Sequence, residues 1–212
     1  MAIDIHGTMT QLSGVRPLFH SEADFQFAFA WQLSRQYPHL SVRLEYRSPY
    51  LPHRGHVDLW LVDGDEQVFI ELKYKTRAFR TIVNNEEFVL LDQIAQDLGR
   101  YDTLKDVHRL EHIVRAMPRS VGVVLLLTND NSYWTESARH ETADKDFRLH
   151  DGRTLSGELK WGEEASAGTR KGREARLPLS GTYQLNWHDY GQAHEGQKGR
   201  FRYVLVNIAR ND

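Results

Sequence analysis

The sequence predicts a single α/β domain in which a mixed β-sheet is flanked by helices. Three observations predict this class: a helical pattern follows Ser21, two apolar runs flank a cluster of turn residues at 63–66, and a continuous aliphatic run covers 121–128. Helical segments that alternate with strand-like runs are typical of α/β folds. The chain of 212 residues is long enough for one sizeable core. We place that core at about residues 20–128 and a β-rich C-terminal extension at about 129–212.

Composition narrows the functional classes. The 27 basic and 29 acidic residues nearly balance, so any binding of nucleic acid must come from local basic patches. Cysteine is absent, which excludes disulfides, cysteine-ligated zinc and thiol catalysis. No apolar run is long enough for a membrane helix, and the N-terminus lacks a signal-peptide pattern. We therefore expect a cytoplasmic protein with no membrane partner.

The first elements are predicted as one helix and one strand ahead of the apolar runs. Residues 1–20 mix polar and apolar positions with glycine and proline, and are predicted as an arm or loop with a short strand. Ser21 is a candidate helix N-cap, and the apolar segment that follows it predicts a mostly buried helix that ends at Pro38. Residues 40–47 alternate as a half-exposed strand does.

The second half of the core is predicted as a loop, a helical region and a strand. Residues 76–85 are predicted as a basic, irregular loop, and residues 86–117 as helix in two segments broken near 99–102. The aliphatic run at 121–128 predicts a strand covered on both faces. The pattern alone thus gives the order α-β-β-β-α-β.

The C-terminal extension is predicted to contain two more strands, at 181–187 and 201–208. They could form a hairpin through the loop at 191–199 that adds to the sheet. Residues 152–181 are rich in glycine, serine and charge and predict a poorly ordered loop. Its basic centre at 170–176 could contact a nucleic-acid backbone or simply be solvated.

The two apolar runs that flank residues 63–66 predict a β-hairpin. A loop of Asp63-Gly64 places Asp58 opposite Phe69, whereas a loop of Gly64-Asp65, or the four-residue loop 63–66, places it opposite Glu71. Because side chains alternate between faces, each of these loops puts Asp58, Glu71 and Lys73 on one face. The opposite face is then expected to carry the apolar side chains Val57, Leu59, Leu61, Ile70, Leu72 and Tyr74.

Two carboxylates and an ammonium group on one face of a sheet need a physical reason, because like charges on neighbouring strands repel each other. A divalent cation removes the repulsion, and Mg²⁺ is typically held by one or two carboxylates together with water and phosphate oxygens. A lysine close to the second acid can orient or deprotonate a water molecule and offset charge that develops at phosphorus. These groups together predict a site that hydrolyses phosphodiester bonds.

Asp58, followed after twelve residues by Glu71-Leu72-Lys73, resembles the PD-(D/E)xK nuclease superfamily. The predicted element order resembles the restriction-endonuclease-like core of that family, although Val57 stands where the family name has proline. The resemblance implies a DNA endonuclease, a hydrolase that depends on Mg²⁺ or Mn²⁺. Asp58, Glu71 and the carbonyl of Leu72 would bind the metal, and Lys73 would serve the attacking water.

The resemblance also implies roles for four further residues. Glu22 resembles the helical acid that joins the metal site in many members, although a first-turn acid on a helix dipole would look the same. Gln93, Arg100 and Tyr101 resemble the polar helix that several branches place over the active site, and we expect them to bind substrate. The alternative for these three is a solvent-facing stripe. Cutting both strands often needs two active sites, so the chain could form a homodimer.

Two other functions are consistent with the sequence. A protein with the nuclease fold could bind nucleic acid or a protein partner without cutting. Residues 108–112 spell H-x-x-E-H, the inverted zinc-peptidase pattern, in which His108 and His112 would bind zinc and Glu111 would act as base. No third ligand stands out downstream, and both histidines fall outside the apolar stripe of this segment. The form of the nucleic-acid substrate (duplex, branched or single-stranded DNA, or RNA) stays open.

Overall fold

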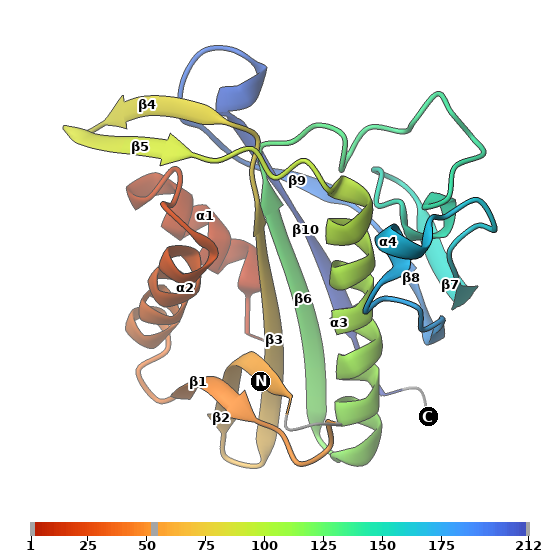
Figure 1. The fold of residues 1–212 in the computed structure, drawn as a ribbon. Coiled ribbons are helices and arrows are strands. Elements are labelled where there is room, and N and C mark those ends of the chain that lie inside the picture. The colour runs from red at the N-terminus through yellow and green to blue at the C-terminus, as the bar shows by residue number, and fades with distance from the viewer. Residues whose placement is uncertain (1–2, 52–54, 211–212) are drawn as a thin grey trace.

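The computed structural model describes residues 3–51 and 55–210, which form an α/β domain around a mixed six-stranded sheet (Figure 1). The strand order is β1-β2-β3-β6-β10-β9. Only β3 and β6 pair in parallel, and the other neighbours in this sheet are antiparallel. The strands are β1 (Ser41–Arg47), β2 (His56–Asp63), β3 (Glu66–Lys75), β6 (Ser120–Thr128), β9 (Trp187–Gln192) and β10 (Arg200–Ile208). The predicted class, a mixed sheet flanked by helices, is confirmed.

Helices cover both faces of this sheet. The helices α1 (Ile5–Val15) and α2 (Glu22–Gln36) pack on one face, and α3 (Gln96–Ala116) packs on the other (Figure 1). Each face has its own apolar core, so side chains that alternate along β3 and β6 enter the two cores in turn. The site described below lies on the α3 side.

The helix α2 begins as the sequence predicts. The side chain of Ser21 accepts a hydrogen bond from the backbone nitrogen of Asp24, so Ser21 is the N-cap. Phe25 and Phe29 are buried, but Phe27 and Trp31 are 59% and 70% exposed. The prediction of a mostly buried helix is therefore correct for one face only, because the sheet covers only that face.

The prediction of a loop or strand for residues 1–20 was wrong, because α1 is a helix. Asp4 caps it by accepting a hydrogen bond from the backbone nitrogen of Gly7. Ile5, Met9 and Leu12 are buried and recur at the spacing of one helical face. This short apolar stripe is weak in the sequence because glycine and threonine lie between its members.

The predicted irregular loop at 76–85 was also wrong. Residues 79–90 form a hairpin of β4 (Phe79–Val83) and β5 (Glu86–Leu90), which projects from the sheet in Figure 1. Its turn is Asn84-Asn85, with φ angles of 51° and 65°. Two-residue hairpin turns with both φ angles positive favour asparagine and glycine. Consequently the helical region starts only at Gln96.

The predicted break in the helix near 99–102 does not occur, and α3 runs without interruption for 21 residues. Gly99 interrupts nothing, since glycine costs a helix interior only about 1 kcal/mol. Its role is packing: a Cβ atom at this position would collide with the hydroxyl group of Tyr133. Glycine here lets Tyr133, which follows β6, lie against the first turn of α3.

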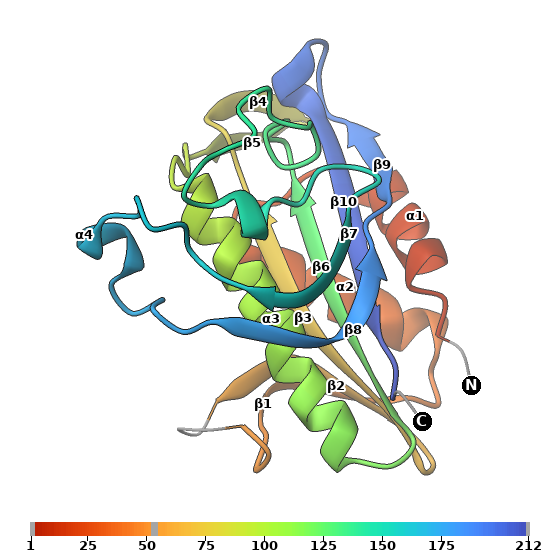
Figure 2. The same cartoon turned by 90° about the vertical axis from the view of Figure 1, so that its right-hand side faces the viewer.

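The C-terminal extension differs from its prediction in part. The strand predicted at 201–208 is β10, and its hairpin with β9 extends the main sheet as expected. The residues predicted as one strand at 181–187 are divided between β9 and β8 (Leu177–Gln184), which pairs with β7 (Thr154–Leu159) in a separate sheet across α3 (Figure 2). The short helix α4 (Ala167–Arg170) and two 3-10 turns, Lys145–Phe147 and Gln197–Gly199, complete the extension.

The prediction of a poorly ordered loop at 152–181 was wrong, because contacts hold its basic centre in place. The Arg173 guanidinium donates two hydrogen bonds to the Asp102 carboxylate on α3, from Nε at 2.8 Å and from Nη2 at 2.7 Å. The indole nitrogen of Trp161 donates to the carbonyl of Arg173.

Among the described residues, no helix combines the length and apolar character needed to cross a bilayer.

Candidate active site

The register of the β2–β3 hairpin decides among the loops that the sequence allowed. Asp63 pairs with Glu66 and Leu59 pairs with Ile70, so the loop is Gly64-Asp65. Continuing this register places Asp58 opposite Glu71. Gly64 has a φ angle of +57°, a conformation that glycine adopts at little cost.

Side chains do not alternate regularly around Asp58, so the predicted apolar face was wrong at Val57. Leu59 lies in the core under α2, whereas Val57 lies in the core under α3. The β1–β2 ladder skips Glu45 and Asp58, and Glu45 has a positive φ of 50°. Asp58 Oδ2 accepts a 2.6 Å hydrogen bond from the backbone nitrogen of Leu72. The regular β2–β3 pairing ends at Leu59 and Ile70, and beyond it the Asp58 carboxylate takes the place of a backbone acceptor for Leu72. Asp58 still lies close enough to Glu71 for the two charges to interact.

Glu71 and Lys73 point from β3 toward α3, which supplies two charged partners. Lys73 Nζ lies 2.6 Å from Asp106 Oδ2. Arg109 Nη1 donates to Asp106 Oδ1 at 2.7 Å and lies 3.1 Å from Glu71 Oε1. Glu71 and Asp106 are only 2% and 4% exposed. We call Asp58, Glu71, Lys73, Asp106 and Arg109 the acid–base cluster.

Glu22 lies at the first turn of α2, next to this cluster. Its Oε2 atom accepts a 2.8 Å hydrogen bond from the backbone nitrogen of Tyr74, and Lys75 Nζ lies 4.0 Å from the same oxygen. Glu22 is thus fixed to the end of β3 that carries Lys73. This contact explains its position better than the helix dipole alone does.

A cavity of about 580 Å³ is lined by three members of the cluster, Lys73, Asp106 and Arg109, with Asp58 and Glu71 behind them. Its lining residues come from the start of α2, the end of β3 and the middle of α3. Eight of the described residues line it, and they are largely charged: Glu22, Gly55, Lys73, Lys75, Asp102, Lys105, Asp106 and Arg109. Four of these side chains are basic and three are acidic, so the cavity offers cationic groups to a phosphate beside carboxylates that could face a metal ion.

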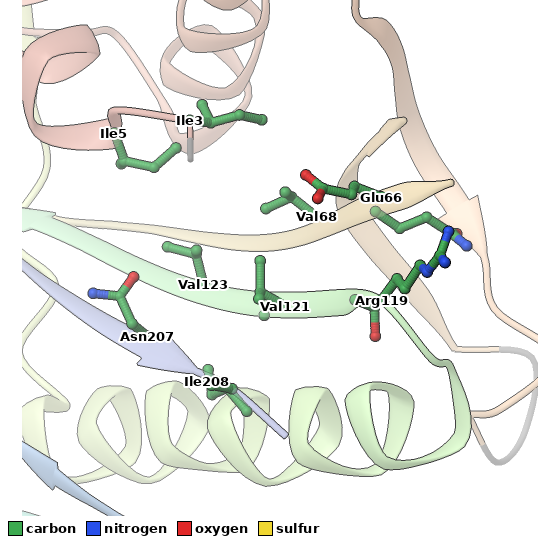
Figure 3. Close-up of a pocket in the computed structure, with 13 residues that line it drawn as sticks. Ile3, Ile5, Glu66, Val68, Arg119, Val121, Val123, Asn207 and Ile208 are labelled. Atoms are coloured by element: carbon green, nitrogen blue, oxygen red, sulfur yellow. The ribbon is translucent and has the colours of Figure 1, made fainter. Parts of the chain in front are cut away.

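A second cavity, of about 480 Å³, is apolar and lies away from this chemistry (Figure 3). It is bordered by Ile3, Val68, Val121 and Ile208, with Arg119 at its edge. It shares no lining residue with the charged cavity. We therefore place the candidate active site in the charged cavity.

Burial raises the pKa of both hairpin acids. For Glu71 the neighbouring Asp106 and Asp58 add to burial, and Arg109 and Lys73 offset it only in part, so the pKa lies well above its usual value. For Asp58, burial outweighs the hydrogen bond from Leu72 and the charge of Lys73, and the pKa is raised. Both acids would hold their charge more easily with an additional cation nearby.

The two basic groups of the cluster stay protonated. Burial pulls the pKa of Lys73 down, but the carboxylates of Asp106, Glu71 and Glu22 outweigh it and raise the pKa above its usual value. Burial likewise pulls the pKa of Arg109 down, but the carboxylates of Glu71 and Asp106 outweigh burial and raise the pKa above its usual value. Lys73 therefore carries a positive charge beside the hairpin acids.

The donor set fits a hard divalent cation that keeps several other ligands. In the described part of the chain, three cluster carboxylates face two cluster cations, so the cluster lacks one positive charge. Glu71 Oε1 is buried and accepts no hydrogen bond there. No three His, Cys, Asp or Glu side chains within the described ranges converge as a ligand set. Two carboxylates, a carbonyl and water are the ligands that Mg²⁺ commonly has.

Gln93, Arg100 and Tyr101 do not form the predicted stripe over the active site. Gln93 precedes α3, where its Oε1 accepts a 3.4 Å hydrogen bond from the backbone nitrogen of Thr76. Arg100 donates to Asp144, and Tyr101 is buried with its hydroxyl donating to the carbonyl of Ala175. None of the three lines the charged cavity. The C-terminal extension occupies the face of α3 on which Arg100 and Tyr101 lie.

Asp106 and Arg109 are the functional-site residues that the sequence analysis missed. With Asp102 and Lys105 they recur at the i, i+3, i+4, i+7 spacing of one helical face, beside the apolar stripe of Leu104 and Val107. A charged stripe directly next to the apolar one was the available signal, because such residues lie at the edge of the buried face.

The contacts of Glu111 in the H-x-x-E-H pattern connect two elements of the fold. His108 and His112 lie with their Nε2 atoms 3.2 Å apart. Glu111 accepts hydrogen bonds from the backbone nitrogens of Ser180 and Gly181 and from the hydroxyl of Tyr183, at 2.7–3.1 Å. Within the described ranges no third metal-binding side chain joins these histidines. Glu111 therefore joins α3 to β8.

Replacing Glu111 by glutamine is expected to lower the free energy of unfolding at pH 7 by about 1–3 kcal/mol, because the backbone donors of β8 lose a charged acceptor. Burial favours a higher pKa for Glu111, but hydrogen bonds from His108, Tyr183 and the backbone lower it to about 2 from a usual 4.5. A carboxyl whose pKa is depressed by folding stabilises above its unfolded pKa and loses that effect as pH falls through its folded pKa. Urea unfolding should show the difference between wild type and variant shrinking as the pH falls from 4.5 towards 2. A difference that is constant with pH would contradict this role.

No protein-family model and no curated protein matches the sequence, so the assignment below depends on the geometry of the site.

Proposed function

We propose that the chain is a metal-dependent nuclease that hydrolyses phosphodiester bonds, with DNA as its substrate, on a restriction-endonuclease-like core of PD-(D/E)xK type. The observation that carries the proposal is the assembly of Asp58, Glu71 and Lys73 beside one charged cavity. The order α2, β1, β2, β3, α3, β6 supports it, since the β4–β5 hairpin is the only element inserted into the expected core in the described chain.

Asp58, Glu71 and the Leu72 carbonyl would hold Mg²⁺ or Mn²⁺, and Glu22 would add a second acid from α2. A bound divalent cation supplies polarisation of a phosphoryl oxygen and activation of water. Lys73 Nζ donates a 3.2 Å hydrogen bond to the carbonyl of Leu72, so its ammonium lies beside one of the proposed metal ligands. This contact supports a shared role for the two groups.

The residues of the chain itself would orient the substrate and offset its charge. Lys73, held by Asp106, would serve the attacking water and stabilise negative charge that develops on the phosphate. Lys75 and Lys105 line the same cavity and are suited to contact neighbouring backbone phosphates. Arg109 would neutralise Glu71 and Asp106 before the metal binds.

A second candidate is a protein with this fold that binds nucleic acid without cutting it. One observation favours it: Lys73 and Arg109 already pair with Asp106 and Glu71, so most of the buried charge is compensated without a metal. In this case the cavity would bind phosphate through its lysines alone.

The test is incubation of the protein with plasmid, branched and single-stranded DNA and with RNA, in buffers containing Mg²⁺ or Mn²⁺. We expect cleavage of at least one DNA substrate, which EDTA abolishes. Absence of cleavage on every substrate with either metal would overturn the nuclease proposal. Retained binding of DNA in gel-shift experiments would then favour the second candidate.

A further inference from the structure

The C-terminal extension contains a polar cavity that the proposed function does not use. It measures about 320 Å³ and lies between the first turns of α3 and the segment 131–150. Arg100, Arg148, His150 and Ser132 are among its lining residues. None of its lining residues belongs to the charged cavity of the candidate active site.

Arg148 carries a largely buried charge that forms no direct ion pair with a described carboxylate, although its charge reaches Glu141. Its side chain is 9% exposed. Its Nη2 atom donates to Thr142 Oγ1 at 2.9 Å and to the backbone carbonyl of Arg139. In the described ranges no acidic side chain forms an ion pair with it. Arginine is rarely buried without a charged partner, because desolvation of an unpaired guanidinium is costly.

Asp144, an acid that lines the cavity, already has two hydrogen-bond donors. Asp144 accepts a hydrogen bond from Arg100 Nη1 at 2.7 Å and another from Thr142 Oγ1 at 2.6 Å. Its charge is therefore neutralised by Arg100. Glu136, the other acid that lines the cavity, is exposed to solvent. Neither acid of the described lining therefore forms an ion pair with Arg148.

Three polar atoms of this cavity are buried and have no hydrogen-bond partner among the described residues. They are Ser132 Oγ, His150 Nδ1 and Arg100 Nε. Buried polar groups in native proteins are nearly always satisfied, so such atoms gathered in one cavity require further partners, from ordered water or from a bound species. Burial, followed by the charge of Arg153, lowers the pKa of His150, which agrees with a positive surrounding.

We propose that this cavity binds a phosphate group. The guanidinium groups of Arg148 and Arg100, the hydroxyl of Ser132 and the ring of His150 offer donors from several elements. A phosphate accepts more hydrogen bonds than a carboxylate, and arginine suits its geometry. The phosphate could be free or part of a nucleic acid. Binding of free phosphate here does not depend on the nuclease proposal.

The experiment measures the affinity of the full chain for inorganic phosphate by calorimetry. The variants are Ser132→Ala, Arg148→Gln and, as a matched control, Arg139→Gln, whose exposed side chain is outside the cavity. We expect Ser132→Ala to weaken phosphate binding about tenfold, the factor of one hydrogen bond to a charged group. Its thermal stability without phosphate should equal that of wild type, because its hydroxyl has no partner to lose. Arg139→Gln should bind as wild type does.

Two outcomes would overturn the proposal. One is the absence of phosphate binding to the wild-type chain. The other is an affinity for inorganic phosphate that is unchanged in Ser132→Ala. If Lys73→Met then abolishes phosphate binding, the phosphate binds in the candidate active site instead. Because Arg148→Gln removes a buried charge and can impair folding, Ser132→Ala carries the decision.

A second arm identifies the source of the phosphate. A short DNA strand with a 5′-phosphate is compared with the same strand without it. Tighter binding of the phosphorylated strand, lost in Ser132→Ala, would assign the cavity to a nucleic-acid end. If the two strands bind equally while the binding of inorganic phosphate depends on Ser132, the cavity would be assigned to free phosphate. Both results support a phosphate cavity.

Discussion

Replacing Lys73 by methionine is expected to lower the rate of metal-dependent cleavage by about a hundredfold or more, the effect of losing one preorganised charge at a developing anion. Methionine preserves most of the length of the side chain and removes only the ammonium group. Arg109 still donates to Asp106 in the variant, so the fold should persist. Single-turnover cleavage of plasmid DNA in Mn²⁺ measures the rate.

The matched control is Lys160→Met, which removes an exposed lysine of the extension that is outside the charged cavity. Its rate should equal that of wild type. Circular dichroism of both variants separates loss of chemistry from loss of fold. Cleavage by Lys73→Met at the wild-type rate would remove Lys73 from the mechanism.

Replacing Arg109 by methionine is expected to lower the free energy of unfolding by about 3–5 kcal/mol without metal, the usual cost of removing one partner of a buried ion pair. Glu71 and Asp106 would be left buried with Lys73 as their only cluster cation. Mn²⁺ should stabilise this variant more than it stabilises wild type, because the metal then replaces the missing charge. Urea unfolding with and without Mn²⁺ measures both effects.

The control for this variant is Arg115→Met, in the last turn of the same helix, where the side chain is exposed. Its effect should stay within about 0.5 kcal/mol, as is usual for surface substitutions. Adding Glu71→Gln to Arg109→Met should restore part of the lost stability, since the repulsion between Glu71 and Asp106 disappears. If Arg109→Met were as stable as Arg115→Met, the ion pairs around Glu71 would not contribute to the fold.

The hairpin that carries the acids could be predicted because its signals are local. Its turn residues, its apolar runs and the spacing of Asp58 and Glu71 all lie within a short stretch of sequence. What the alternation rule missed is the irregularity at Glu45, which turns Val57 to the other core. That irregularity depends on the pairing of β1 with β2, which a single strand does not reveal.

The β4–β5 hairpin, which the sequence analysis missed, has a local signal in its turn residues. Asn84-Asn85 separates two short runs with β-branched and aromatic residues, and asparagine favours the positive φ angles of such turns. Treating residues 86–95 as helix then moved Gln93 onto a helical face that it does not share with Arg100.

The roles of Arg100 and Tyr101 could not be predicted from sequence because their partners are distant along the chain. Arg100 donates to Asp144, and Tyr101 donates to the carbonyl of Ala175. The C-terminal extension covers this side of α3, and only its packing shows which helical face stays open to the cavity. The face that remains open carries Asp106 and Arg109.

The central claim is that the paired acids of the β2–β3 hairpin hold a divalent cation. Calorimetric titration of Mn²⁺ into the wild-type chain and into Glu71→Gln tests it most directly, because glutamine keeps the shape of the side chain and removes its charge. The account predicts one Mn²⁺ per chain in wild type and loss of that binding in the variant. Binding of Mn²⁺ that is undiminished in Glu71→Gln, or absent from wild type, would contradict it.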